Sequence, residues 1–157
     1  MLGWNVDLGV DVGTCVTRVY QRGVGIVLAE ASAVALSLAS GDMVAAGNEA
    51  KLMADQGSAE ARVVFPLAGG VLADHEAGAL MVRAFVKRAL GKRYLFMPRL
   101  VAAITTGATP VERAALLHAV QDAGARRVRL VDSTLAGAIG AGLAPTDRGS
   151  RLVVSIG

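Results

Sequence analysis

Apolar and polar residues alternate along the first part of the chain. Val6, Leu8, Val10 and Val12 alternate with Asp7, Gly9 and Asp11, which predicts a strand with one buried face over residues 6–12. Gly13 and Thr14 separate it from a second such run at 15–20, so the two runs should form a hairpin. A third run, at 26–29, follows two glycines. Three strands joined by short turns must be mutually antiparallel.

Helical and strand patterns then alternate to the end of the chain. A weaker hairpin is expected at 33–38 and 43–46. We expect helices at 48–55, 74–91, 109–124 and 134–141, and strands at 62–65, 100–104, 128–131 and 151–155. Asp74 is a candidate N-cap, and Thr109 with Glu112 forms a capping box around a proline at the first helical position. This order predicts an α/β fold, a mixed sheet with helices on both faces, and residues 30–74 inserted as a small subdomain.

Composition narrows the class of protein. The chain has 157 residues, of which 54% are hydrophobic and 18% charged, enough apolar mass for one core. Its apolar runs stop short of the roughly 20 residues that a membrane span needs, and no secretory signal is visible. Cys15, the single cysteine, has no internal partner, and on a strand we expect a buried, unreactive thiol. His75 and His118 lack partners at metal-ligand spacing.

Charge is unevenly distributed despite a formal net charge of only +3. Residues 77–111 contain no Asp or Glu, yet they hold six cations: Arg83, Lys87, Arg88, Lys92, Arg93 and Arg99. The expected loop in their midst suits an anionic membrane interface, with Trp4 as a second anchor; its residues are Lys92, Arg93, Tyr94, Leu95, Phe96 and Met97. Alternatively, Leu95 and Phe96 pack into the core beneath a solvated basic face. Nucleic acid is not expected as a partner, because the stretch has few aromatic residues and no recognition motif.

A series of short motifs resembles the MreB family of bacterial actin homologues. The motifs are DLGVDVGT at 7–14, GIVL at 25–28, GNEAK at 47–51, PL at 66–67, GVLAD at 70–74, VER at 111–113, AGA at 123–125 and AIGAGL at 138–143. They span nearly the whole chain but only the first half of such a protein. The resemblance implies an actin-like, ribonuclease H-like ATPase fold with an incomplete nucleotide-binding subdomain at 1–29 and 75–157. It also implies that the second actin-fold domain lies outside these 157 residues.

The resemblance also implies a biological role. Members of this family bind ATP and Mg²⁺, self-associate into filaments on the cytoplasmic side of the inner membrane, and act with cell-shape morphogenesis proteins. Two alternatives remain open at this point. One is a membrane scaffold that does not hydrolyse nucleotide, and the other is a sugar kinase, acetate kinase or chaperone ATPase of the same superfamily.

By resemblance, phosphate contacts fall on two loops. The first contains Asp11, Gly13, Thr14 and Cys15, and Asp11 would hold Mg²⁺ through water; the second would begin at Ser155 and Gly157. Glycine suits this task because its backbone N–H groups approach phosphate without a Cβ in the way. An ordinary glycine-containing turn beside a solvated aspartate accounts for the same residues.

Two departures from the family pattern concern hydrolysis. Ser133 stands where the family has the glutamate that orients the attacking water, and Ser155 stands where it has an aspartate. A serine hydroxyl is no base at neutral pH, so we expect weak or absent ATP turnover. Asp132 could substitute only if the backbone turned to present it. No catalytic residue is therefore assigned.

Overall fold

The main sheet has five strands and mixed direction. The computed structural model describes residues 7–91, 98–143, 146 and 151–154. The strand order is β10-β9-β1-β2-β3, with β1 (Asp7–Val12), β2 (Val16–Gln21), β3 (Gly25–Ala31), β9 (Arg99–Ile104) and β10 (Arg127–Asp132). Strands β1, β9 and β10 are parallel, whereas β2 runs antiparallel to β1 and β3. The predicted α/β class and the antiparallel start are confirmed.

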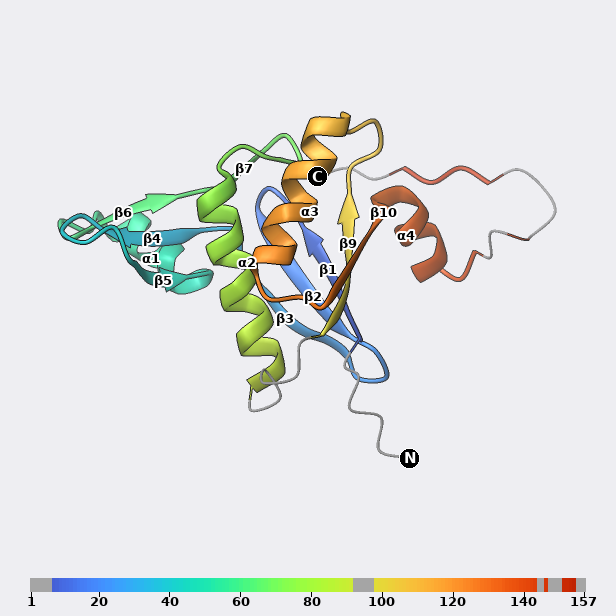
Figure 1. Cartoon of the computed structure of the whole chain (residues 1–157), viewed down its shortest axis with the longest axis horizontal. Coiled ribbons are helices and arrows are strands. Elements are labelled where there is room, and N and C mark those ends of the chain that lie inside the picture. The colour runs from blue at the N-terminus through green and yellow to red at the C-terminus, as the bar shows by residue number, and fades with distance from the viewer. Residues whose placement is uncertain (1–6, 92–97, 144–145, 147–150, 155–157) are drawn as a thin grey trace.

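Two helices cover one face of this sheet (Figure 1). They are α2 (His75–Leu90) and α3 (Pro110–Asp122), and both begin at the predicted caps: Asp74 accepts from Ala77 N, and Thr109 and Glu112 form a capping box. Alternate strand residues point toward these helices because successive side chains of a strand lie on opposite faces. The buried cluster contains Leu8, Val10, Val12, Val19, Met81, Phe85, Leu100, Ala102 and Ile104.

The opposite face of the main sheet is largely open. Val101 is 44% exposed and Tyr20 is 49% exposed, although both lie on strands with neighbours on each side. A short helix, α4 (Ser133–Gly140), follows β10 directly and contacts β9 and β10, yet none of its residues is buried. The open face therefore retains apolar side chains in solvent.

A second, smaller sheet lies to one side of the main one (Figure 1). It has the order β5-β4-β6, with β4 (Val34–Ser37), β5 (Met43–Ala46) and β6 (Ala61–Val64), and it packs with α1 (Asn48–Gln56). Small side chains form its own buried cluster: Ala33, Ala35, Ala45, Ala50 and Ala61. Glu30 of β3 links this part to α2, because its Oε2 accepts from the backbone N–H of Asn48 in α1 at 3.3 Å and from Arg88 Nη1 in α2 at 2.7 Å.

The structure differs from the predicted elements at three places. A short hairpin occupies a stretch that the sequence predicts as loop. Its two strands, β7 (Leu67–Ala68) and β8 (Val71–Leu72), have two residues each. The strand predicted at 151–155 is wrong for the described residues 151–154, which pair with no sheet edge and leave Leu152 88% exposed. Cys15 lies in the β1–β2 turn, so its thiol is exposed and not buried in a strand. Within the described residues, every helix is too short or too polar to cross a bilayer.

A candidate phosphate-binding turn

The turn between β1 and β2 lies at the carboxyl end of β1. Strands β1, β9 and β10 are parallel, so their carboxyl ends meet at one edge of the sheet. The residues that follow β9 and β10 lie at this edge too, and Thr106 Oγ1 there donates to Asp132 Oδ1 at 2.7 Å. In open α/β sheets, ligands bind in the crevice outside the carboxyl ends of the strands. The turn at 13–15 is therefore placed where a ligand would be expected.

Gly13 is required by the local backbone. A Cβ at this position would lie 2.6 Å from the carbonyl oxygen of Val16, closer than real Cβ atoms approach backbone. Thr14 and Cys15 at the tip are exposed, and neither backbone N–H donates to an oxygen within the described residues. Free backbone N–H groups on a tight turn favour an anion. The exposed tip of the turn thus carries two N–H groups that donate to no described oxygen.

The side chain of Thr14 joins the turn to a second loop. Its Oγ1 accepts a hydrogen bond from the backbone N–H of Gly70, at 2.8 Å. Gly70 connects β7 to β8 and has φ +81°, a conformation that favours glycine. Beneath these loops lies a cavity of about 10 Å³ that Val12, Gly70 and Ile104 help to line, no larger than one water molecule. The described residues therefore form one open wall of a site and not an enclosed pocket.

Asp11 is the carboxylate nearest in sequence to the turn. Its side chain is 54% exposed, and Arg18 Nη1 lies 3.7 Å from its Oδ2. Mg²⁺ keeps several waters and takes one or two carboxylates together with phosphate oxygens. The described residues contain no cluster of three side chains that could hold a metal by themselves. A single exposed carboxylate such as Asp11 suits Mg²⁺ that is held through water beside a bound phosphate. Arg18 would compete with the ion for this carboxylate.

Asp132 is engaged as the N-cap of α4. Its Oδ1 accepts from Thr134 Oγ1 at 2.6 Å, from Thr106 Oγ1 at 2.7 Å and from Thr134 N at 3.0 Å. The Thr134 hydroxyl, and then that of Thr106, lowers the pKa of Asp132 to about 2. Such a carboxylate stays ionised at neutral pH but is a poor proton acceptor. Ser133 is the first residue of α4 and places a hydroxyl, not a carboxylate, beside it.

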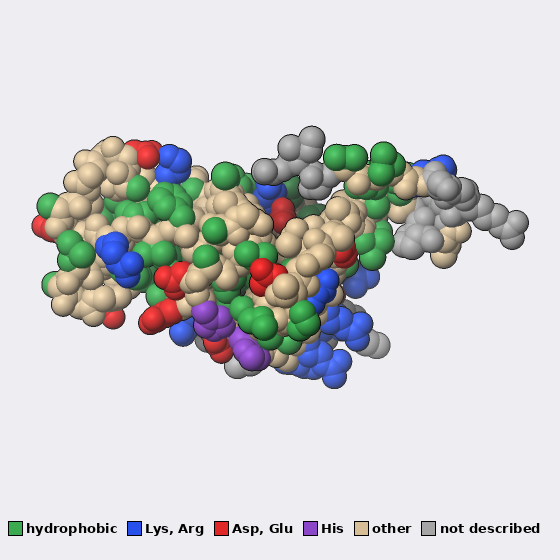
Figure 2. Space-filling view, turned by 90° about the horizontal axis from the view of Figure 1, so that it is seen from above, with side chains coloured by type: hydrophobic (Ala, Val, Ile, Leu, Met, Phe, Trp, Pro, Cys, Tyr) green, Lys and Arg blue, Asp and Glu red, His purple; other side chains and the backbone are tan. Residues whose placement is uncertain are grey.

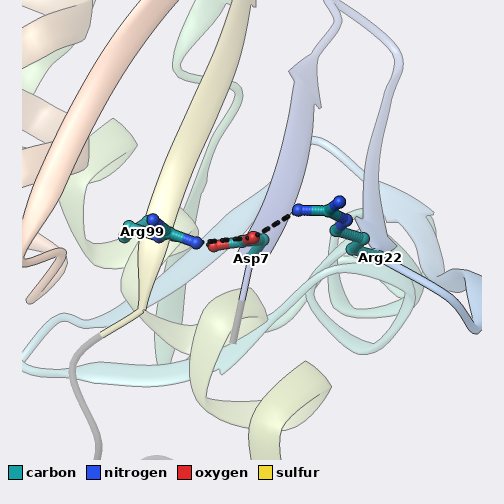
Figure 3. Close-up of polar contacts among 3 residues, drawn as sticks. All are labelled: Asp7, Arg22 and Arg99. Carbon is teal, nitrogen blue, oxygen red and sulfur yellow. Dashed lines mark hydrogen bonds and ion pairs between the residues drawn. The ribbon is translucent and has the colours of Figure 1, made fainter. Parts of the chain in front are cut away.

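The basic stretch is partly neutralised by carboxylates from earlier strands. Arg99 pairs with Asp7, which also binds Arg22 (Figure 3), and Arg88 pairs with Glu30. These ion pairs could not be anticipated from a stretch that itself contains no acid. The proposed membrane residues Trp4, Lys92, Arg93, Tyr94, Leu95, Phe96 and Met97, and the second-loop residues Ser155 and Gly157, lie outside the described residues.

A surface hollow lies between α2 and α3, on the helix-bearing side of the molecule. It has a volume of about 240 Å³ and is lined by charges of both signs, among them Glu76, Arg83 and Asp122. His75 Nε2 lies 3.5 Å from Asp122 Oδ2 at its rim, and the histidine side chains are visible at the surface in Figure 2. None of its lining residues belongs to the turn at 13–15.

Comparisons with known proteins agree with the observed fold. The family model for MreB/Mbl protein matches residues 5–157. The cell shape-determining protein MreB of Escherichia coli (strain K12) is 36% identical over 156 residues, an alignment that covers 96% of this chain and 45% of that protein. The chain thus spans somewhat less than half the length of the curated relatives it matches.

Solved structures show the same relationship. The crystal structure of MreB5 of Spiroplasma citri bound to ADP is similar with a TM-score of 0.75 and 28% identity, over 88% of this chain and 41% of that one. The MamK double helical filament is similar with a TM-score of 0.74 at 22% identity, over 88% of this chain and 44% of that one. The likeness to MamK concerns the fold alone.

Proposed function

The chain belongs to the MreB/Mbl family of cell-shape proteins, and from that premise we propose that its turn at Gly13–Cys15 binds the phosphates of ATP. One observation supports this most directly: at the carboxyl ends of the parallel strands, a turn that needs glycine at position 13 carries two N–H groups that donate to no oxygen among the described residues. A relative, MreB5 of Spiroplasma citri, has been crystallised with ADP. In this proposal the turn forms one wall of the nucleotide cleft.

Each described residue of this wall has a separate task. The N–H groups of Thr14 and Cys15 donate to phosphate oxygens, and the absent Cβ of Gly13 lets the phosphate approach the backbone. Asp11 holds Mg²⁺ through water, and the ion when bound neutralises phosphate charge. The Thr14 hydroxyl is already committed to Gly70 N and anchors the turn.

We propose further that ATP turnover by this chain is weak. Asp132, the carboxylate next in sequence to Ser133, caps α4 and has a pKa of about 2. Ser133 offers a hydroxyl, which does not accept a proton at neutral pH. Nucleotide binding without efficient hydrolysis suits a structural protein better than an enzyme that must turn over its substrate.

Self-association and membrane attachment complete the proposal. We infer that the chain assembles in filaments on the cytoplasmic side of the inner membrane together with cell-shape morphogenesis proteins, with residues 30–74 as an inserted subdomain. The separate alanine cluster of the β5-β4-β6 sheet supports that division. The similarity to a MamK filament supports only the fold that such assembly would use. A membrane scaffold without nucleotide is the second candidate, favoured by the exposed cations Arg83 and Lys87 on α2.

Calorimetric titration with two nucleotides tests the central proposal. Mg²⁺-AMPPNP carries the full triphosphate unit, whereas AMP lacks the β and γ phosphates, so only the former should bind measurably. Vesicles containing anionic lipid are tested in parallel with and without AMPPNP. Binding of vesicles but of neither nucleotide would favour the nucleotide-free scaffold and contradict the phosphate-binding turn.

A further inference from the structure

Only two buried polar side chains occur among the described residues, and both lie behind the candidate phosphate-binding turn. Thr17 and Ser32 are almost completely buried. Buried hydroxyls are costly unless they are hydrogen-bonded, so a pair kept in an apolar core needs a reason. Ser32 lies between β3 and β4, and Thr17 lies on β2. They meet at 2.8 Å between Oγ atoms.

The direction of this hydrogen bond follows from proton counting. Ser32 Oγ donates its one proton to the carbonyl oxygen of Gly13, at 2.5 Å. A hydroxyl has a single proton to give. Thr17 must therefore donate to Ser32, which fixes a relay from the Thr17 hydroxyl through the Ser32 hydroxyl to the Gly13 carbonyl. Ser32 also donates its backbone N–H to the carbonyl of Cys15, at 3.0 Å.

The relay decides which groups of the turn face solvent. A trans peptide unit directs its C=O and its N–H to opposite sides. Since the Gly13 carbonyl is held inward by Ser32, the N–H of Thr14 in the same peptide unit is directed outward. Carbonyl oxygens that faced outward would repel a phosphate, whereas N–H groups attract it. Ser32 thus orients the donor that the proposed function requires without touching the ligand.

We propose that Ser32 and Thr17 are positioning residues that preorganise the turn at 13–15 for phosphate. The expected effect on phosphate binding rests on the proposed function, whereas the hydrogen-bond relay itself does not depend on any nucleotide. Preorganised donors bind more tightly because the ligand need not turn them at the moment of binding. Without the relay, the Gly13 peptide can rotate, and part of the population presents its carbonyl to the ligand.

Three substitutions distinguish an effect of the hydrogen-bond relay from an effect of core packing. Ser32→Ala removes the central hydroxyl, Thr17→Val removes the first donor at nearly constant volume, and Thr17→Ser keeps the hydroxyl while losing a methyl group. We expect Ser32→Ala and Thr17→Val to weaken Mg²⁺-AMPPNP binding about tenfold. Thr17→Ser should retain near wild-type affinity although it loses more packing than Thr17→Val. Ser37→Ala is the matched control, because that hydroxyl serves a surface turn of the small sheet.

A second measurement keeps the inference independent of nucleotide binding. ¹⁵N relaxation of the Thr14 and Cys15 amides in the ligand-free protein should show lower order in Ser32→Ala and Thr17→Val than in wild type, Thr17→Ser and Ser37→Ala. If the wild type binds no AMPPNP but this pattern appears, the proposed function fails and the relay stands. If the turn is equally ordered in all five proteins, or if AMPPNP binds equally to all of them, the positioning role is wrong.

Discussion

Arg99 and Asp7 face each other across two neighbouring parallel strands and form a bidentate ion pair. Arg99 Nε donates to Asp7 Oδ1 at 2.6 Å and Nη2 donates to Oδ2 at 2.8 Å, while Arg22 adds a longer bond at 3.3 Å. The hydrogen bonds from Arg99, the larger cause, hold the pKa of Asp7 below its ordinary value of 3.8. The pair joins β1 to β9 at the edge of the sheet away from the turn.

The Asp7–Arg99 pair should stabilise the folded chain at neutral pH and lose this effect in acid. The folded-state pKa of Asp7 is lowered, so its contribution is fully present above pH 3.8 and is lost as the pH falls through the lower folded value. Asp7→Asn should reduce the melting temperature at pH 7 by on the order of 2 °C, since exposed pairs contribute little. The difference from wild type should vanish in strong acid. Thermal unfolding followed by circular dichroism between pH 2 and 7 measures this, with the exposed Asp42→Asn as control; a deficit that does not shrink as the pH falls through this range would contradict the linkage.

Gly13→Ala should weaken phosphate binding strongly with little effect elsewhere. The added Cβ would meet the Val16 carbonyl at 2.6 Å, so the turn must change shape. Gly9→Ala on the same strand is the matched control, because its Cβ would sit 3.7 Å from the Cβ of Tyr20, an ordinary contact. We expect AMPPNP affinity to fall at least tenfold in Gly13→Ala and to stay within about twofold in Gly9→Ala. Equal affinities in the two variants would mean that the turn does not bind the phosphates.

Asp132→Ala should affect stability and not turnover. The carboxylate caps α4, so its loss should lower the melting temperature at pH 7. Because the pKa of Asp132 is lowered to about 2, this stabilisation is present above pH 3.8 and declines only as the pH approaches 2. Phosphate release from ATP should be equally slow in wild type and variant. Ser133→Ala, which leaves the cap intact, is the control for both assays, and a drop in phosphate release specific to Asp132→Ala would assign the carboxylate a catalytic role.

Gly47→Ala should destabilise the chain more than Gly57→Ala does. Both glycines flank α1 with positive φ, +79° and +69°, so alanine is strained at either. A Cβ at Gly57 meets open space, whereas one at Gly47 would overlap Glu30, whose carboxylate is held by Arg88. We expect a loss of about 1 kcal/mol for Gly57→Ala and roughly 3 kcal/mol for Gly47→Ala. Urea denaturation measures both, and similar losses would show that Glu30 moves aside freely.

Local signals in the sequence predicted the elements well. The capping box of Thr109 and Glu112 and the N-cap at Asp74 depend on residues three positions apart, and the structure confirms both. The β7–β8 hairpin was missed because two-residue strands beside Pro66 carry no periodicity. The strand at 151–155 was wrong because an apolar run becomes a strand only when a sheet edge accepts it.

Contacts between residues far apart in the chain could not be predicted from the sequence. Arg88 and Arg99 lie in a stretch without acids, and their partners Glu30 and Asp7 precede them by 58 and 92 residues. The role of Ser32 was equally hidden. A serine fifteen residues after Thr17 gives no pattern, and only the return of β3 behind the β1–β2 turn brings the two hydroxyls together.

The Thr17–Ser32 relay consists wholly of neutral groups. Acid that protonates Asp7 or Asp132, and salt that screens Arg99, leaves the two buried hydroxyls and the Gly13 carbonyl unchanged. The shape of the turn at 13–15 should consequently respond little to the ionic composition of its surroundings. Among the described residues next to the turn, Asp11 and Arg18 are then the groups through which salt or acidity would alter ligand capture.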